Sequence, residues 1–339
     1  MEEPPKKPTE ENLKKATTDI ELPHNLGFDL VRCTEAAAIA AGRWMGKGNL
    51  EDADQGASES MQELLNTLQI RGNIDIGEEV KPEMHTPMES GGTVGTGEGP
   101  EVDLVVDPID GRQLLAEGRQ GVISAIGAAP KGGMRSPAPA IYMEKLVVSR
   151  EVADALVEEC MNAPVAWTLG LIARIKEKKV EDLVVFVLDR PRHKTVIQDI
   201  RNAGARAMLR HDGDIAGALM AATPGGPVDI LMGVGGVPQG MMTACAIKAL
   251  GGKMLGRLAP QTEEERGDID NAELSSQEIL TSDDLVTSKD VYFAATGITD
   301  GPLMEGVQYH GNRIKTHSVI LRSTTGSRRD IYTERQIES

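Results

Sequence analysis

The segment VDPIDG, residues Val106–Gly111, combines residue types that bind metal ions and phosphate. The apolar stretch before it predicts a strand that delivers Asp107, after which Pro108 bends the chain and Asp110 supplies a second carboxylate. Two carboxylates brought together at a strand end favour a hard cation such as Mg²⁺ or Mn²⁺. Gly111 would let a phosphate approach the backbone at the start of a helix. The alternative is an Asx-type turn that holds no metal.

Other strand candidates also end in polar or acidic clusters. These clusters are Glu78 after Ile74–Ile76, Asp189–His193 after Leu183–Leu188, and Gly235–Gln239 after Asp229–Val234. In open α/β sheets, ligands bind beyond the carboxyl ends of the strands. The recurrence therefore predicts one active site that several strand ends build together.

The expected elements alternate between helices and strands, which is typical of an α/β layered fold. Apolar spacing and end signals predict helices over Leu26–Met45, Asp52–Leu68, 151–161, 164–177, 194–203, 215–222 and 237–250. Strands are expected over Ile74–Ile76, Val102–Val106, Gly121–Ala129, Ile141–Val148, Leu183–Leu188, Arg206–Leu209, Asp229–Val234, Val291–Ala295 and Ser318–Arg322. The acidic stretch Thr262–Asp270 is expected to be an exposed loop.

The length of 339 residues predicts about two domains. We expect a disordered tail over 1–23, a metal- and phosphate-binding lobe over 24–150, and a second α/β lobe over 151–339 whose C-terminal strands complete the site. The net charge of −16 disfavours nucleic acid, because that binding needs Lys and Arg to neutralise phosphates. No apolar run approaches the ~20 residues that cross a membrane, and the N-terminal segment lacks the apolar core of a secretory signal. A cytoplasmic protein with no nucleic-acid or membrane partner is expected.

The three cysteines, Cys33, Cys160 and Cys245, are widely spaced among apolar neighbours and form no CxxC pair. They are expected to be reduced and buried rather than to bind a metal. Aromatic residues make up 3% of the chain, so surfaces on which bases or sugars could stack are scarce. The glycine-rich loop Ser90–Gly99 lacks the Lys-Ser/Thr pair of a P-loop, which argues against nucleotide binding.

A longer series of motifs, spread over about residues 24–330, resembles one known family. In order, the motifs are RCTEAAAIAAGRWMGKGN, ADQ (53–55), IGEE (76–79), VGTGEGPEVDLVVDPIDG, IYMEKLVV, LDRPRH, DGD, GVGGVPQG and ATGITDGPLMEGV. Together they resemble a class II fructose-1,6-bisphosphatase of the bacterial type, some members of which also hydrolyse sedoheptulose-1,7-bisphosphate. The resemblance implies the two-lobed layered fold of the lithium-sensitive sugar phosphatase superfamily, and association as a homodimer or homotetramer.

The resemblance also implies the residues of the site. Metal ligands fall on Asp54, Glu78, Asp107, Asp110 and, at the position of a family glutamate, Gln239. Substrate contacts fall on Asp110, Gly111, Arg112, Tyr142, Arg190, Pro191, Arg192, Asp212, Gly213, Asp214 and Gly236. Asp54, Asp107, Asp110 and Arg112 are the catalytic candidates. Metal ions would bridge the 1-phosphate and lower the pKa of a bound water, which attacks phosphorus in line.

Several of these residues have a structural alternative. Asp54 could cap the second helix, and Tyr142 could be an ordinary half-buried strand residue. Arg190 and Arg192 could grip a phosphate with forked hydrogen bonds, or could lie in a surface turn paired with acidic neighbours. We expect His193 to be structural, because the implied mechanism needs no histidine.

Departures from the family pattern cluster on the catalytic side of the site. Arg112 replaces a threonine that helps to position the attacking water, and Gln239 replaces a metal-binding glutamate. Glu79 stands in place of a glycine and Val80 in place of a carboxylate. Two hypotheses follow: an active metal-dependent sugar bisphosphatase, or an impaired paralogue that serves as a sugar-phosphate-binding, regulatory or structural subunit. The four remaining carboxylates favour the first.

Overall fold

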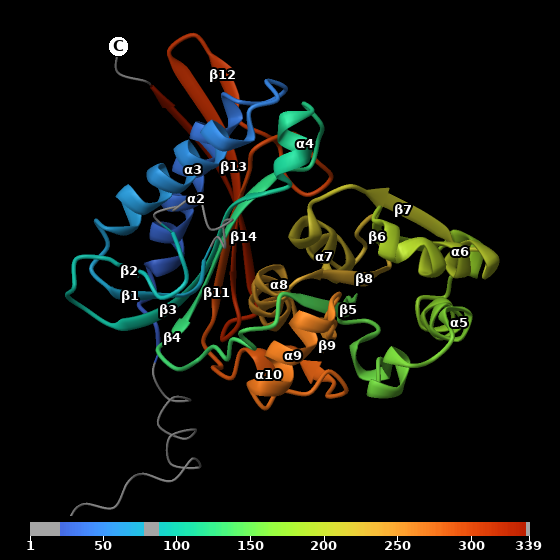
Figure 1. The fold of residues 1–339 in the computed structure, drawn as a ribbon. Helices are drawn as coiled ribbons and strands as arrows, with labels where there is room; N and C mark the ends of the chain where they lie inside the picture. Colours follow the sequence, from blue (N-terminus) through green and yellow to red (C-terminus); the bar gives the residue numbers. More distant parts are fainter. Residues whose placement is uncertain (1–20, 78–87, 337–339) are drawn as a thin grey trace, which may run out of the picture.

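Two β-sheets and the helices on their faces form the α/β fold that the sequence predicts (Figure 1). The computed structural model describes residues 21–77 and 88–336. The first sheet is ordered β12 (Gln308–His310), β13 (Arg313–Arg322), β11 (Tyr292–Gly297), β4 (Ile123–Pro130), β3 (Glu101–Asp110), β1 (Arg71–Ile76) and β2 (Thr93–Val94), and β14 (Ser327–Gln336) pairs with β13. The second sheet is ordered β10 (Leu280–Thr281), β9 (Lys253–Leu258), β5 (Tyr142–Val148), β8 (Ile230–Gly236), β6 (Val184–Leu188) and β7 (Arg206–Arg210).

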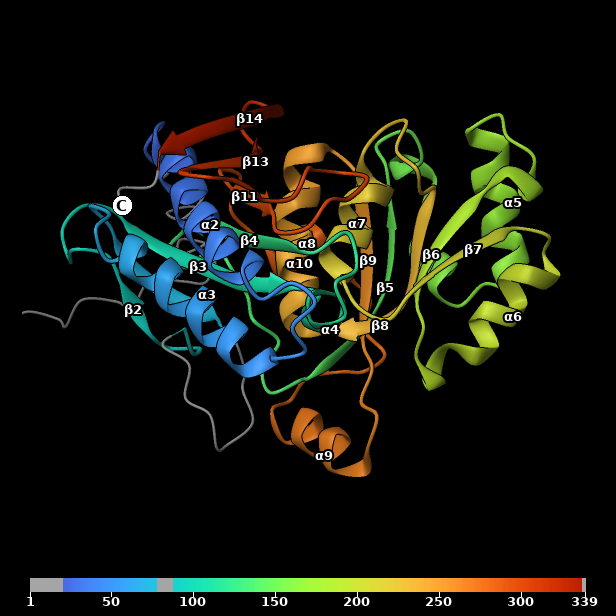
Figure 2. The same cartoon turned by 90° about the horizontal axis from the view of Figure 1, so that it is seen from above.

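Helix layers alternate with the two sheets (Figures 1 and 2). The pairs are α2 (Leu26–Gly42) with α3 (Leu50–Leu65) outside the first sheet, α7 (Asp214–Ala222) with α8 (Val237–Leu250) between the sheets, and α5 (Val165–Ile175) with α6 (Lys194–Asn202) outside the second sheet. The remaining helical elements are α4 (Arg112–Ala116), α9 (Glu263–Asn271), α10 (Ser282–Leu285), η1 (Ala153–Ala155), η2 (Glu158–Met161), η3 (Val180–Asp182) and η4 (Pro191–His193). Clusters of buried apolar side chains join each sheet to the helices on its faces.

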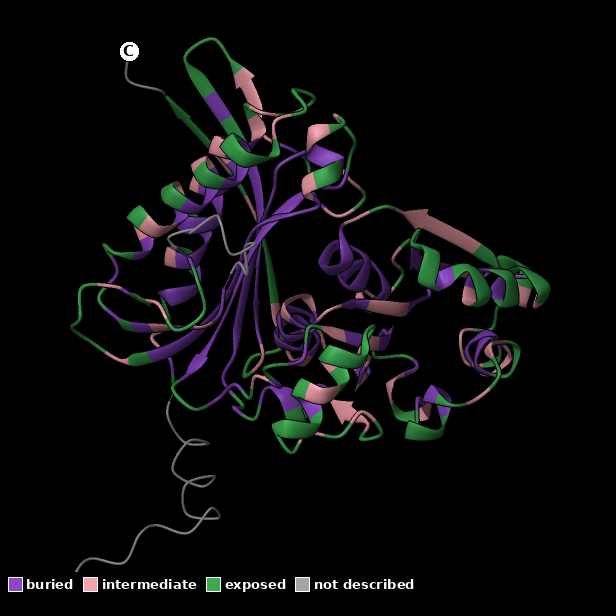
Figure 3. Ribbon diagram, in the orientation of Figure 1, coloured by how far each residue is buried: buried purple, intermediate pink, exposed green. Residues whose placement is uncertain are grey.

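The central helices α7 and α8 are largely buried because a sheet lies on each side of them (Figure 3). A helix that is apolar nearly all round is typical of such a position. Gly217 of α7 lets the Phe186 ring pack directly against the helix backbone, where a Cβ atom would collide with the ring. Strand β3 lies between two helix layers and is buried from Val102 to Asp110. Its last residues, including two aspartates, therefore end inside the molecule.

The cysteines Cys33, Cys160 and Cys245 are all buried and unpaired, as predicted. Burial raises the pKa of the Cys33 and Cys245 thiols to about 12, which keeps both protonated. Among the described helices, none has the length and apolar character needed to span a bilayer.

Sheet pairing does not follow the expected division at residue 150. Strand β5 lies before this residue and belongs to the second sheet, whereas β11–β14 lie after it and belong to the first. In Figure 1 these red C-terminal strands lie beside the green β4 strand. Strand β11 inserts between β4 and β13 and pairs antiparallel with both. Without it, β4 would present an unpaired edge inside the molecule.

The prediction of an exposed loop over Thr262–Asp270 is wrong, because this stretch forms most of α9. Thr262 caps the helix by accepting a hydrogen bond from the Glu265 N–H. Glutamates fill the first turn, where the helix dipole favours negative charge. The helix predicted over 151–161 is wrong too, since only the short 3-10 turns η1 and η2 form there.

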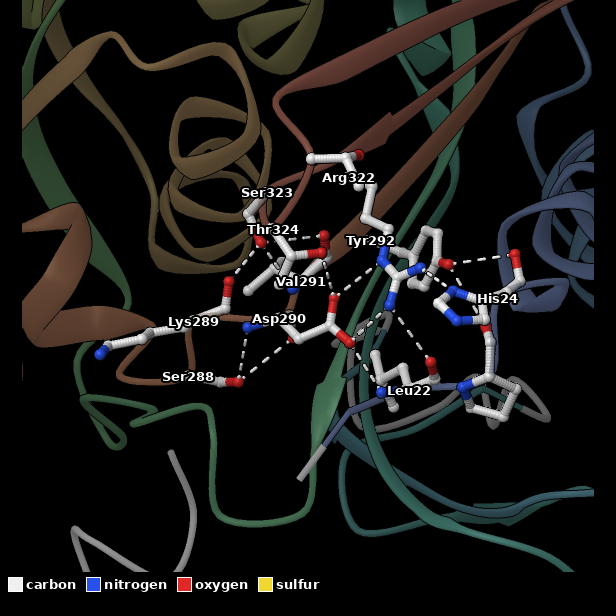
Figure 4. A network of polar contacts seen from close by, with 12 residues as sticks. Leu22, His24, Ser288, Lys289, Asp290, Val291, Tyr292, Arg322, Ser323 and Thr324 are labelled. Carbon is white, nitrogen blue, oxygen red and sulfur yellow. Dashed lines mark hydrogen bonds and ion pairs between the residues drawn. The ribbon is translucent and has the colours of Figure 1, made fainter. Parts of the chain in front are cut away.

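A buried ion pair ties the start of the described chain to the end of β13 (Figure 4). Arg322 donates from Nε and Nη2 to the two carboxylate oxygens of Asp290, at 3.0 Å in each case. Asp290 also accepts the Leu22 backbone N–H at 2.7 Å. The Arg322 guanidinium lies 4.8 Å from the centre of the Tyr292 ring. This forked pair joins three segments that are far apart in the sequence.

Replacing Asp290 by Ala should lower the free energy of unfolding by about 3–5 kcal/mol, because Arg322 would stay buried without its counter-ion. Urea unfolding followed by circular dichroism measures this change. Arg313→Ala is the matched control, since the Arg313–Glu334 pair is exposed to water and should contribute far less to stability. Equal losses in the two variants would contradict the role assigned to the buried pair.

Candidate active site

A cavity of about 290 Å³ lies where residues of the two sheets meet. Its lining includes the candidates Asp107, Asp110, Gly111, Arg112, Tyr142, Arg190, Arg192, Asp212, Asp214, Gly236 and Gln239. Of the other candidates, Pro191 and Gly213 lie in turns that line it, Asp54 contacts Arg112, and Glu78 lies outside the described residues. The departures Glu79 and Val80 also lie outside them. The structure thus brings together residues that are dispersed along the sequence.

The helices α4, α7 and α8 begin at this cavity. Gly111 precedes α4 with φ 108° and Gly213 precedes α7 with φ 87°, left-handed conformations that favour glycine. Gly236 precedes α8. Asp212 accepts the Gln113 N–H at 3.2 Å, which links the first turn of α4 to the turn before α7. The positive ends of the α7 and α8 dipoles favour an anion in the cavity.

Asp107 and Asp110 are carboxylates at the end of β3, with 8% and 3% of their surface exposed. Asp110 accepts the Ala216 N–H at 2.9 Å, from the first turn of α7, and Asp107 accepts the Gln239 side-chain amide at 3.0 Å. Burial raises the pKa of Asp107 to about 6. Burial, followed by the negative charge of Asp107, raises the pKa of Asp110 well above its ordinary value. The pair therefore favours a cation or a proton beside it.

Asp54 lies inside α3 and is buried, so it is not the helix cap. Asn49 caps α3 by accepting the Asp52 N–H. Arg112 donates to Asp54 Oδ2 at 2.8 Å. The other oxygen, Oδ1, is buried and has no hydrogen-bond partner within the described ranges 21–77 and 88–336. Burial raises the pKa of Asp54 and outweighs the opposing charge of Arg112.

The carboxylates fit a hard divalent cation by their chemistry. Asp107 and Asp110 supply neighbouring oxygens, and Asp54 supplies a buried oxygen without a partner in the described chain. No three Asp, Glu, His or Cys side chains of the described residues, however, are arranged as a ready metal site. Arg112 and Gln239 instead place N–H donors on two of the carboxylates. A cation held by the three aspartates would therefore compete with these donors.

Arg192 and Tyr142 pack together where the second sheet lines the cavity. The guanidinium lies 5.0 Å from the centre of the Tyr142 ring and donates to the Val234 carbonyl at 2.9 and 3.2 Å. Arg190 lines the cavity from the same turn. Arginines in such a position bind phosphate oxygens with forked hydrogen bonds.

His193 supports the turn that presents these arginines. Its Nε2 accepts the Val234 N–H at 2.7 Å, so Nδ1 carries the proton and donates to the Leu188 carbonyl at 2.6 Å. Burial lowers the pKa of the ring, which favours this neutral form. These contacts agree with a structural role for His193.

Lys145 is a residue of the site that the motifs did not identify. It lies in β5, is 1% exposed and forms an ion pair with Asp214. Gly235 leaves room for the pair, because a Cβ atom there would lie 2.8 Å from the Lys145 Nζ. The signal in the sequence is a lysine within a strand that is otherwise apolar on that side, since a buried charge requires a partner.

A cavity that joins carboxylates, arginines and helix N-termini is typical of enzymes that hydrolyse phosphate esters. The model of the bacterial, glpX-encoded fructose-1,6-bisphosphatase family matches residues 24–335, and the chain belongs to this family of phosphoric monoester hydrolases. It is 38% identical over 320 residues to the class 2 fructose-1,6-bisphosphatase of Haemophilus influenzae, with 90% of this chain and 94% of that protein covered. It is 37% identical over 328 residues to the D-fructose 1,6-bisphosphatase class 2/sedoheptulose 1,7-bisphosphatase of two Synechococcus strains, with 89% of this chain and 93% of each relative covered. The family resemblance inferred from the motifs is confirmed.

Replacing Lys145 by Met should lower the free energy of unfolding by about 3–5 kcal/mol, because Asp214 would stay buried without its partner. Differential scanning calorimetry measures the loss. Lys131→Met is the control, since the Lys131–Glu101 pair lies on the surface and should contribute far less to stability. A Lys145→Met protein as stable as this control would refute the importance of the buried pair.

Because the pKa of Asp107 is raised, the difference in stability between Asp107→Asn and the wild type should depend on pH. The folded protein keeps the Asp107 proton to about pH 6, whereas the unfolded chain loses it near the ordinary value of 3.8. Between these values the wild type loses stability from this group as the pH rises. The stability of Asp107→Asn relative to wild type should therefore rise by about 2–3 kcal/mol from pH 4 to pH 6.5. Urea unfolding in EDTA at several pH values tests this, and a constant difference would disprove it.

Proposed function

We propose that this chain hydrolyses the 1-phosphate of fructose-1,6-bisphosphate with Mg²⁺ or Mn²⁺, in gluconeogenesis or carbon fixation, and that sedoheptulose-1,7-bisphosphate is a second substrate. The observation that carries the proposal is the cavity in which buried carboxylates of the first sheet meet arginines of the second-sheet side. Carboxylates bind a cation and arginines bind phosphate, so a sugar with two phosphates suits both parts. The similar Haemophilus influenzae protein is named for the first activity, and the Synechococcus proteins are named for both. Association as a homodimer or homotetramer stays a prediction.

At one end of the cavity, Arg190 and Arg192 bind the phosphate that is not transferred. The Arg192 contacts with Tyr142 and the Val234 carbonyl hold its guanidinium in place before substrate arrives. Preorganisation of this kind lowers the entropy lost on binding. Asp214, held by the buried Lys145, is an acceptor for a sugar hydroxyl.

At the other end, the backbone at Gly111 and the Arg112 side chain bind the 1-phosphate beside Asp107 and Asp110. The Ala216 N–H orients the Asp110 carboxylate. Asp107 and Asp110 would hold a divalent cation, which would supply positive charge to the phosphate and activate a water molecule. In-line attack of water on phosphorus breaks the bond to the sugar oxygen, so that inorganic phosphate forms and the sugar oxygen leaves as a hydroxyl with a proton from the water.

A second candidate function is that of a sugar-phosphate-binding, regulatory or structural subunit with impaired catalysis. Two contacts favour it: the Arg112–Asp54 ion pair and the hydrogen bond from Gln239 to Asp107. Each contact occupies a carboxylate that would have to bind a cation in the proposed hydrolysis. Neither contact involves Arg190 or Arg192, so these two arginines can bind a sugar phosphate whether or not the protein hydrolyses it.

The purified protein should release inorganic phosphate from fructose-1,6-bisphosphate with Mn²⁺ or Mg²⁺, and release should stop in EDTA. The double variant Arg112→Thr/Gln239→Glu should be at least about tenfold faster, because it unpairs Asp54 and adds an anionic ligand. A colorimetric phosphate assay measures both proteins, with fructose 6-phosphate as the control substrate.

If the wild type released no phosphate but bound the bisphosphate in calorimetry, hydrolysis would be rejected in favour of the binding subunit. If the double variant were no faster, the Arg112 and Gln239 contacts would not be what limits turnover.

A further inference from the structure

We propose that Arg112 is a built-in competitor of the divalent cation at Asp54, so that its guanidinium must leave this carboxylate before a metal ion can bind there. The inference rests on the proposed metal dependence and goes beyond it. In this proposal, the Arg112 side chain determines how tightly the site binds a divalent cation in the absence of substrate.

The position of Arg112 between Asp54 and the cavity is the first support. Arg112 lines the cavity, whereas Asp54 is 4% exposed and is not part of the lining. The ion pair of 2.8 Å joins the first residue of α4 to the second turn of α3. A cation that enters from the cavity therefore meets the guanidinium before it meets the Asp54 carboxylate.

Charge is the second support. Asp54, Asp107 and Asp110 are all buried, and buried carboxylates favour a positive charge or a proton beside them. The Arg112 guanidinium lies 2.8 Å from Asp54 Oδ2 and lines the same cavity as Asp107 and Asp110. Its guanidinium thus already supplies part of the positive charge that a divalent cation would supply.

The exposure of Arg112 makes the exchange feasible. Its side chain is 41% exposed, whereas that of Asp54 is 6% exposed. The arginine can therefore move toward water or toward a substrate phosphate while Asp54 stays in α3. A phosphate group can accept two hydrogen bonds from a guanidinium and carries more negative charge than a carboxylate. A substrate phosphate therefore competes well with Asp54 for Arg112.

A double-mutant cycle on the full chain tests the competition by Mn²⁺ binding without substrate. Arg112→Met removes the guanidinium without adding a ligand for a hard cation, and it should tighten Mn²⁺ binding about tenfold or more. In the Asp54→Asn background the same replacement should change the Kd less than about threefold. Titration of free Mn²⁺ by electron paramagnetic resonance gives the four dissociation constants.

Two further variants make the cycle specific. Arg190→Met removes a positive charge from the same cavity without touching Asp54, and it should change the Mn²⁺ affinity less than about threefold. Arg112→Gln repeats the main replacement with a polar side chain, in case Arg112→Met does not fold. Circular dichroism of each variant identifies those that are folded.

The competition would be overturned by unchanged Mn²⁺ affinity in both Arg112 variants, or by equal tightening with and without Asp54. Equal tightening in Arg190→Met would also overturn it, because a general effect of charge would then explain the result. Since Mn²⁺ binding is measured without substrate, failure of hydrolysis is recognised separately in the phosphate-release assay.

Discussion

The burial of two aspartates at the end of β3 is the constraint on which the rest of the site depends. Because β3 lies between two helix layers, Asp107 and Asp110 end inside the molecule, where an unpaired charge is costly. Hydrogen bonds from the surrounding helices stabilise the two carboxylates. A backbone N–H of α7 donates to Asp110, and the Gln239 side chain in α8 donates to Asp107. The same helix N-termini that stabilise these carboxylates also make the cavity suitable for phosphate.

The departures from the family pattern act at this same point. Arg112 and Gln239, at the positions where the motifs predict a threonine and a glutamate, bring N–H donors to Asp54 and Asp107. The arginines near β6 and the Lys145–Asp214 pair are untouched by these changes. The structure therefore places N–H donors on two of the buried carboxylates, while Arg190 and Arg192 line the cavity apart from these contacts.

The sequence predicts those structural features that depend on residues close together along the chain, and it predicts less well those that depend on contacts between distant segments. The β3 strand, the cavity turns and the buried cysteines follow from local apolar patterns and motifs, and they are where the patterns placed them. The acidic composition of α9 indicates an exposed loop, whereas Thr262 and the glutamates after it form a good helix start. Asp54 was open to interpretation as a cap, because nothing local distinguishes it from the true cap, Asn49.

By itself, the sequence determined the family, the α/β class and the set of residues that could form the site, because these depend on residue types and on spacing along the chain. Only the tertiary structure decided which side chains contact one another. It paired Arg112 with Asp54, placed Lys145 behind Asp214, and completed the first sheet with the C-terminal strands. Such contacts join segments that are distant in sequence, so the burial and charge that stabilise them exist only when the sheets and helices have packed.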